Sequence, residues 1–173
     1  MTQIIYSKMD ITKKKILFID LDDTLIKTAS GETFAQDITD FRVRKDVLDR
    51  IKSLNFSRVA IITNQGGIPK FVTLEDFIAK LKTIEFFVFS YCKIAVSSHF
   101  CDSMDKDDPR RKPNTGMLED VLHTLPNGMR KKEIMLMVGD ASGNGAWSDS
   151  DIRTAENFGI DYMDVNDFVN ANK

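Results

Sequence analysis

The chain has 173 residues, 42% of them hydrophobic and 29% charged, which is typical of one compact globular domain. Its formal net charge of −2 excludes a protein that attracts nucleic acid over its whole surface. No stretch approaches the roughly 18 consecutive apolar residues of a membrane span, and residues 1–15 lack the apolar core of a secretory signal. We therefore expect one soluble intracellular domain over residues 1–173, with its core at about 15–169, and the sequence leaves nucleus or cytoplasm open.

Short apolar runs and helical patterns alternate along the chain. The apolar runs are Lys15–Asp20, Arg58–Thr63, Lys93–Ser97 and Ile134–Gly139. The helical patterns that follow them are Lys45–Leu54, Thr73–Tyr91, Thr115–Leu125 and Asp151–Phe158. Because the apolar runs do not alternate with polar residues, they are typical of buried parallel strands. The order predicts an α/β fold with a doubly wound, mainly parallel sheet and helices on both faces.

Smaller features complete the predicted architecture. Leu25–Phe34 predicts a small β-flap that turns at Ser30-Gly31, and Val165–Ala171 predicts a final short helix. The aromatic stretch Thr83–Tyr91 is expected to pack in the core, because a helix that is apolar nearly all round is usually buried.

The two cysteines are spaced neither as a metal-binding pair nor as a disulfide framework, which fits a reducing compartment. Cys92 lies in an apolar run, so we expect it to be buried. Cys101 stands beside charged residues, so we expect an exposed thiol without function.

Reactive side chains follow each of the four predicted strands. The clusters are Asp20-Leu21-Asp22-Asp23-Thr24, Thr63-Asn64-Gln65, Arg111-Lys112 and Gly139-Asp140. An acidic cluster alone is more often a turn or a helix cap. In an open parallel sheet, however, the carboxyl ends of the strands form one edge where ligands bind, so these clusters should converge. Lys112 comes later after its strand than the others, and its placement rests partly on the resemblance given below. Asp20 and Asp140 each end an apolar run, which is costly for a carboxylate without a compensating cation. Together they predict Mg²⁺, the usual hard cation where phosphate is also bound.

Several strings resemble a known family. Phe18-Ile19-Asp20-Leu21-Asp22-Asp23-Thr24-Leu25 carries the DxDxT[LV] motif of the haloacid-dehalogenase-like superfamily, a Rossmann-like fold. Further strings resemble the 3′-phosphatase domain of polynucleotide kinase–phosphatases. They are Ile62-Thr63-Asn64-Gln65-Gly66-Gly67-Ile68, Arg111-Lys112-Pro113-Asn114-Thr115-Gly116-Met117 and Val138-Gly139-Asp140-Ala141-Ser142-Gly143. The likeness runs from about Lys15 to about Val169.

The resemblance implies a Mg²⁺-dependent hydrolase that removes 3′-phosphates from nucleic-acid ends, DNA favoured over RNA, as in DNA repair. Asp20 would be the nucleophile that forms an aspartyl-phosphate, and Asp22 would donate a proton to the leaving group and later activate water. Thr63 and Lys112 would hold phosphoryl oxygens. Asp20, Asp140 and the main-chain carbonyl of Asp22 would hold Mg²⁺.

The resemblance also assigns substrate-binding roles. The residues concerned are Thr24, Asn64, Gln65 and Arg111. For Thr24, a hydrogen-bond donor that fixes the loop is the competing interpretation. Asp149 and Asp151 stand where an acid supports Lys112 or the metal from behind, or caps the helix that begins near Ser150. Asp151 is the nearer match.

Access to the predicted site favours a large substrate. No cap domain of roughly 50 residues fits within Leu25–Arg58 or Gly66–Lys112, so the site should be open to a strand end. The expected backbone contacts are Arg42, Arg44, Lys70, Arg110 and Arg111. Two departures flank the site, a short loop at Ser142–Ser148 and an acidic insertion at His99–Asp108. A GxxxxGK[ST] phosphate loop is missing, so we expect no kinase activity and no nucleotide cofactor. We also expect a monomer.

Two other functions remain open on these residues. The first is a small-molecule phosphatase of the same superfamily that acts on a sugar phosphate or histidinol phosphate with the same catalytic residues. The second is a catalytically silent module that binds nucleic-acid ends or other proteins. The presence of every motif residue argues against the second.

Overall fold

The computed structural model describes residues 9–143 and 145–171. Residues 1–8, part of the segment in which we expect no secretory signal, lie outside this description. The strands are β1 (Ile16–Ile19), β2 (Ile26–Lys27), β3 (Arg42–Val43), β4 (Arg58–Asn64), β5 (Ala95–Cys101), β6 (Met135–Gly139) and β7 (Asp161–Asp164). The α-helices are α1 (Lys45–Ser53), α2 (Leu74–Cys92), α3 (Gly116–Thr124), α4 (Ser150–Phe158) and α5 (Val165–Asn170). Short 3-10 turns lie at Ile11–Lys13, Asn127–Met129 and Lys132–Ile134.

The main sheet has five parallel strands in the order β5-β4-β1-β6-β7. Its central strand β1 pairs with β4 on one side and with β6 on the other, so the chain winds outward in both directions from β1. Ligands of such sheets bind where the winding reverses, at the carboxyl ends of the strands. The predicted fold class is confirmed, and Asp20, which follows β1, lies at the point of reversal.

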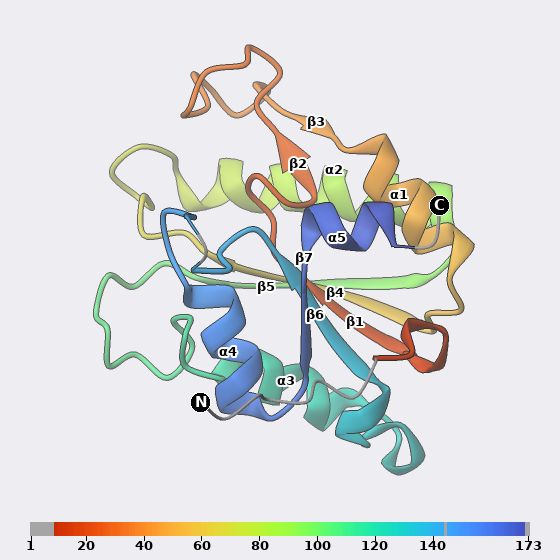
Figure 1. The fold of residues 1–173 in the computed structure, drawn as a ribbon. Coiled ribbons are helices and arrows are strands. Elements are labelled where there is room, and N and C mark those ends of the chain that lie inside the picture. The colour runs from red at the N-terminus through yellow and green to blue at the C-terminus, as the bar shows by residue number, and fades with distance from the viewer. Residues whose placement is uncertain (1–8, 144, 172–173) are drawn as a thin grey trace.

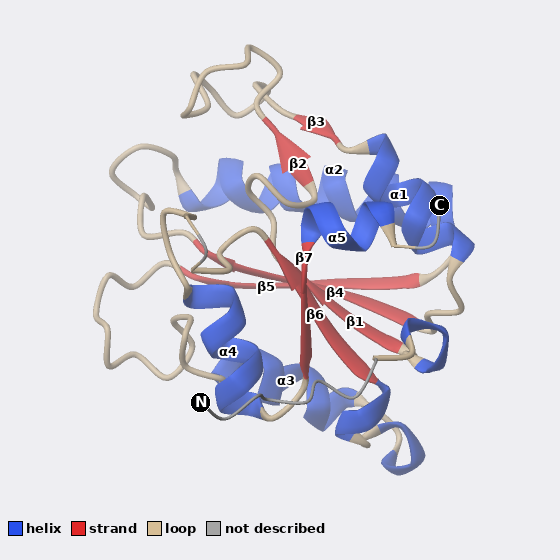
Figure 2. Ribbon diagram, viewed as in Figure 1, coloured by secondary structure: helices blue, strands red, loops and turns tan. Residues whose placement is uncertain are grey.

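Helices cover both faces of this sheet (Figures 1 and 2). One face is covered by α1, α2 and α5, and the other by α3 and α4. Each side encloses its own group of buried apolar side chains. Because helices cover both faces of the sheet, strands such as β1 and β6 have buried side chains on both faces.

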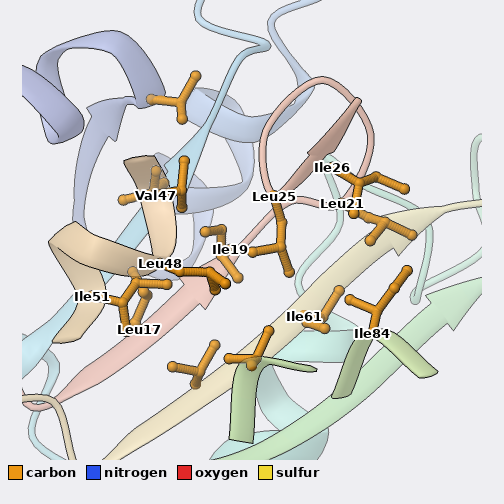
Figure 3. Close-up of a cluster of buried hydrophobic side chains, with 14 of the residues drawn as sticks. Leu17, Ile19, Leu21, Leu25, Ile26, Val47, Leu48, Ile51, Ile61 and Ile84 are labelled. Atoms are coloured by element: carbon orange, nitrogen blue, oxygen red, sulfur yellow. The ribbon is translucent and has the colours of Figure 1, made fainter. Parts of the chain in front are cut away.

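The larger hydrophobic cluster lies beneath α1 and α2 (Figure 3). Leu17 and Ile19 of β1 point into it, together with Ile51 of α1 and Ile84 of α2. All four are fully buried. Burying an aliphatic side chain of this size contributes about 1.5–3 kcal/mol. The strand that carries Asp20 is therefore firmly fixed in the fold.

The flap differs from its prediction. It is the two-stranded antiparallel pair of β2 and β3, so its second strand begins at Arg42 and not before Phe34. The connecting loop is held by the Asp40 carboxylate, which accepts hydrogen bonds from the main-chain N–H of Ser30 (2.7 Å) and of Gln36 (3.0 Å). The pattern of apolar and polar residues in the sequence does not reveal these hydrogen bonds, because the single side chain of Asp40 forms them. Gly31 does lie in the left-handed region expected of a turn, with φ of 83°.

The aromatic helix also differs from its prediction. In α2 the buried stripe is Phe77, Leu81, Ile84, Val88 and Cys92, at helical spacing. Phe86, Phe87 and Phe89 are 67%, 49% and 53% exposed, so the expectation that this stretch packs in the core is wrong for them. The helix contacts the sheet along one side only, and these three rings lie outside that stripe.

Three further differences concern the edges of the sheet. Strand β5 continues to Cys101, whose thiol is buried and not exposed. The predicted insertion at His99–Asp108 therefore begins inside a strand. Strand β7 was not predicted, because its four residues, Asp161-Tyr162-Met163-Asp164, carry too few apolar side chains to signal a strand.

Among residues 9–143 and 145–171, no helix is long and apolar enough to cross a bilayer.

Candidate active site

The loops after β1, β4, β5 and β6 gather at one edge of the sheet, on the left of Figure 1. They enclose a cavity of about 230 Å³. Its wall consists of Asp20, Asp22, Asp23, Thr63, Asn64, Lys112, Asp140, Ala141, Trp147, Ser148, Ser150 and Asp151. The predicted convergence of the clusters is therefore observed.

A tight turn after β1 presents the first acidic residues to the cavity. The N–H of Asp20 donates to the carbonyl of Val138 (2.9 Å), which extends the pairing of β1 with β6 to this residue. The carbonyl of Leu21 accepts from the N–H groups of Leu25 and Ile26, both at 3.0 Å. Asp23 adopts a left-handed conformation with φ of 56°, which aspartate tolerates better than most residues. Asp20 is thus held by the sheet, while Asp22 is carried by the turn.

Lys112 is the buried cation of the site. Its Nζ lies 2.5 Å from Oδ1 of Asp20 and 2.6 Å from Oδ1 of Asp151. Burial acts to lower the pKa of Lys112, but the attraction of the two carboxylates outweighs it and the net pKa is raised. The ammonium group therefore stays charged and links the first cluster to α4.

Asn64 fixes the main chain of Lys112. Its Nδ2 donates to the carbonyl of Lys112 (3.0 Å), and its Oδ1 accepts from the N–H of the same residue (2.9 Å). Both ends of one amide thus hold one peptide segment, which connects the end of β4 with the loop that carries the lysine. These bonds position Lys112, and the substrate contact of Asn64, which lines the cavity, stays a prediction.

Negative charge exceeds positive charge in the cavity. Carboxylate oxygens of Asp20, Asp140 and Asp151 lie within 4.8 Å of one another, and Lys112 contacts two of these residues. Burial raises the pKa of Asp20, and the charge of Lys112 acts against this rise. Burial and the neighbouring Asp151 also raise the pKa of Asp140. The donor set of oxygen atoms with uncompensated charge fits a hard divalent cation such as Mg²⁺.

Asp151 is held more closely than its sequence position indicates. It is buried, and its Oδ2 accepts from the N–H of Ala141 (3.1 Å). The neighbouring Asp149 is exposed at the start of α4 and pairs with Arg153 instead (3.2 Å). The structure therefore places Asp151, and not Asp149, behind Lys112.

Gly139 leaves the space that Asp151 occupies. A Cβ atom at Gly139 would lie 2.2 Å from Oδ2 of Asp151. We expect Gly139→Ala to displace Asp151, release Lys112, and lower the free energy of unfolding by about 2–4 kcal/mol, the range for overpacking together with loss of a buried ion pair. Urea denaturation measures this loss.

The matched control is Gly128→Ala, because a Cβ there meets no atom within 4 Å. Its denaturation midpoint should stay within the narrow range of a surface substitution. Equal midpoints for the two variants would show that the close approach of Asp151 to Gly139 does not matter.

Three of the predicted substrate-binding residues do not line the cavity formed by the described residues. Thr24 is fully buried, and its hydroxyl donates to Oδ1 of Asp140 (3.3 Å), so the competing interpretation of Thr24 as a loop-fixing donor fits the structure. Nε2 of Gln65 donates to Oδ2 of Asp22 (2.7 Å) and to the hydroxyl of Thr63 (2.9 Å). Nη1 of Arg111 donates to the carbonyl of Ser103 (2.7 Å). Thr24 and Gln65 thus contact other residues of the site, and Arg111 contacts the loop at Ser103. Their contacts with substrate stay predictions.

Trp147 was missed by the sequence reasoning. It is 100% exposed and lies on the cavity wall. It is the only tryptophan of the chain, and it follows the Gly139-Asp140 motif in a glycine-containing loop. A large aromatic residue in such a loop was the signal that could have found it, since exposed aromatic side chains beside a site often contact ligands.

Comparisons with known proteins agree with this geometry. A family model described as Polynucleotide kinase 3 phosphatase matches residues 15–168. The bifunctional polynucleotide phosphatase/kinase of Schizosaccharomyces pombe is 36% identical over 163 residues, which cover 91% of this chain and 38% of that protein. The histidine biosynthesis bifunctional protein HisB of Campylobacter jejuni is 29% identical over 153 residues, 85% of this chain and 40% of that protein. The chain thus spans about two fifths of the length of these curated relatives.

A solved structure shares the fold. The D,D-heptose 1,7-bisphosphate phosphatase from B. bronchiseptica, complexed with magnesium and phosphate, superposes with a TM-score of 0.64 at 17% identity. The match covers 86% of this chain and 78% of that one. At this identity the likeness concerns the fold alone.

Proposed function

Because the chain belongs to the polynucleotide kinase 3 phosphatase family, we propose that it removes phosphate from the 3′ ends of nucleic-acid strands. The observation that carries the proposal is the contact of Lys112 with both Asp20 and Asp151 in a cavity that the loops of four strands enclose. Attack on a phosphate monoester needs a nucleophile, here a carboxylate, and a cation beside it that stabilises the negative phosphoryl oxygens.

The reaction proceeds in two steps on Asp20. An oxygen of Asp20 attacks phosphorus and forms an aspartyl-phosphate, while the bond from phosphorus to the 3′ oxygen breaks and Asp22 donates a proton to that oxygen. Asp22 then takes a proton from water, which attacks phosphorus and frees Asp20 and inorganic phosphate. Lys112 and the hydroxyl of Thr63 hold phosphoryl oxygens in both steps.

Mg²⁺ is held by Asp20, Asp140 and the main-chain carbonyl of Asp22 in this proposal. When bound, it neutralises charge on the phosphoryl oxygens. Support comes from the acidic group in the cavity and from the magnesium in the solved heptose bisphosphate phosphatase of the same fold. Asp151 keeps its two oxygens on Lys112 and Ala141, so it balances the lysine rather than the metal.

The open rim of the site supports a strand end as the substrate. Within the described residues the segments beside the cavity contain the flap, helices and strands already named, and no separate folded unit covers the opening. We propose that the protein acts as a monomer on DNA ends in preference to RNA ends.

Of the arginines expected to contact the nucleic-acid backbone, Arg44 pairs with Asp46 (2.7 Å) and Arg110 pairs with Asp120. Arg42 and Lys70 remain the stronger candidates.

One assay tests reaction, substrate and metal together. Matched DNA and RNA oligonucleotides with a 3′-phosphate are incubated with the protein, with Mg²⁺ and with a chelator, and released phosphate is measured. We expect release from DNA ends in Mg²⁺ and none with the chelator. If no 3′-phosphorylated strand loses phosphate, the proposed function is wrong and a silent binding module becomes the better interpretation.

A small-molecule phosphatase is the second candidate, because HisB of Campylobacter jejuni is similar over 85% of this chain. The same catalytic residues would serve it. A panel of sugar phosphates and histidinol phosphate belongs in the same assay. A kcat/KM higher on any of these than on the oligonucleotide would favour this candidate.

Trp147 offers a stacking surface for a terminal base. Stacking of a base on an aromatic side chain is worth about 1–3 kcal/mol, so Trp147→Ala should raise KM for a 3′-phosphorylated oligonucleotide by roughly 5- to 100-fold. Turnover of p-nitrophenyl phosphate, which has no base, should be unchanged. Since this tryptophan is the only one in the chain, quenching of its fluorescence by an oligonucleotide measures the contact directly. Unquenched fluorescence at saturating oligonucleotide would rule the contact out.

A further inference from the structure

A second and larger cavity lies on the side of the flap away from the catalytic carboxylates. It has a volume of about 540 Å³ and is enclosed by the flap and its loop, α1 and α2, which lie side by side in the upper half of Figure 1. Its wall consists of Ile38, Thr39, Phe41, Arg42, Val43, Lys45, Leu48, Ala79, Lys80, Thr83, Phe87 and Tyr91. We call it the flap groove. The mechanism proposed above makes no use of it.

The wall of the flap groove is mainly apolar, and its charged side chains are all cations. Among its wall residues that the structure describes, Arg42, Lys45 and Lys80 are basic and none is acidic. The chain as a whole has a net charge of −2, so this balance is local. Asp49 lies just outside the wall and pairs with Lys45 (2.7 Å), so it neutralises part of this positive charge.

Phe87 is the exposed ring of the flap groove, whereas Phe41 and Tyr91 are partly buried against the core. Phe87 is 49% exposed although it lies on the wall. Lys80 lies over the ring of Phe41, with Nζ 5.4 Å from the centroid. Exposed rings together with nearby cations are the arrangement by which proteins bind single strands without reading their sequence, since bases stack on the rings and phosphates pair with the cations.

The flap groove is connected to the active-site turn through the flap. Asp22 forms a β-bridge with Ile26, and Ile26 pairs with Val43, which lies on the wall of the flap groove. Two strand spacings, roughly 10 Å, thus separate the main chain of Asp22 from that wall. A strand bound at its 3′ end therefore needs only a few nucleotides to reach that wall.

We propose that the flap groove binds the single strand that leads to the 3′ end, upstream of the nucleotide that carries the phosphate. The inference rests on the proposed function, because it assigns a second contact to the same polyanionic substrate. Phe87 stacks on a base, and Lys80 and Arg42 contact phosphates. Binding there is independent of sequence and falls as the salt concentration rises.

The test is the dependence of KM on strand length. For 3′-phosphorylated DNA of two and of eight nucleotides, we expect KM to be at least roughly tenfold lower for the longer strand. Lys80→Glu and Phe87→Ala should each remove most of that advantage, with unchanged KM on the dinucleotide. Lys80→Glu should also reduce the slope of log KM against log salt by about 0.7 or more on the longer strand.

Matched controls lie on surfaces outside the flap groove. Lys131→Glu makes the same charge change at an exposed lysine beside the start of β6, and Phe89→Ala removes an equally exposed ring from α2. Both should keep the length dependence of the unchanged protein.

Two negative results have different meanings. If both lengths are dephosphorylated with equal KM, or if Lys80→Glu and Phe87→Ala behave like their controls, the flap groove does not bind the strand, while the proposed function stands. If neither length is dephosphorylated although p-nitrophenyl phosphate is turned over, the proposed function itself is wrong.

Discussion

Asp20→Asn is expected to abolish phosphate release, with kcat lowered by at least about 10⁴-fold, while the protein still folds and binds its substrate. An amide oxygen is too weak a nucleophile to form the aspartyl-phosphate, and loss of a nucleophile costs on this order in other enzymes. The fold should survive because Lys112 keeps its second partner, Asp151, at 2.6 Å. The measurements are single-turnover phosphate release and fluorescence anisotropy with a labelled 3′-phosphorylated oligonucleotide.

Asp23→Asn is the matched control for this experiment. It makes the same chemical change three residues along the chain, at a residue whose left-handed conformation asparagine adopts readily. We expect kcat to stay within a few-fold of the unchanged protein. If Asp20→Asn retained turnover comparable to that of Asp23→Asn, Asp20 would not be the nucleophile.

Lys112→Met is expected to reduce both stability and activity. Methionine fills a similar volume but leaves the carboxylates of Asp20 and Asp151 buried without their cation. Removal of one partner from a buried ion pair typically costs 3–5 kcal/mol, so the free energy of unfolding should fall by about that amount. Turnover should fall by about 10³-fold or more, since a preorganised charge on the phosphoryl group is lost. Urea denaturation and phosphate release measure the two effects.

A double variant separates the buried charge from other consequences. Asp151→Asn added to Lys112→Met removes one unpaired carboxylate, and the amide oxygen still accepts from the N–H of Ala141. The double variant should therefore be more stable than Lys112→Met alone, although Asp151→Asn by itself should destabilise the protein. Additive losses of stability would show that the two residues are not coupled.

Local sequence patterns predicted the parts of the fold that repeat a simple rule. The apolar runs became parallel strands, which are buried in β1, β4 and β6 and only partly buried in β5. Residues at or just after the ends of three of these runs line the cavity, as for Asp20, Thr63 and Asp140. This works because the carboxyl ends of parallel strands meet at one edge whatever the loops contain. The sequence also indicated an acid behind Lys112, and it favoured Asp151 over Asp149.

Other parts depend on contacts between distant residues, which local patterns do not reveal. Asn64 was assigned to substrate binding because the string that contains it resembles one in the 3′-phosphatase family. Its amide also holds the main chain of Lys112, 48 residues away in the sequence. The exposed rings of α2 could not be separated from the buried ones, since apolar residues occur all round that helix and only its contacts with the sheet define the buried side. The return strand of the flap was misplaced because Asp40 closes its loop through hydrogen bonds.

The two bonds of Lys112 also determine when a growing chain acquires its site. Asp20 precedes Lys112 by 92 residues, and Asp151 follows Lys112 by 39. Asp20 is therefore synthesised well before Lys112, whereas α4, the helix that completes the charge balance around Lys112, is synthesised after it. Domains generally fold as whole units during synthesis. A nascent chain that lacks α4 therefore carries Asp20 and Lys112 without Asp151, the second partner of the lysine, so the site is complete only after α4 has been synthesised.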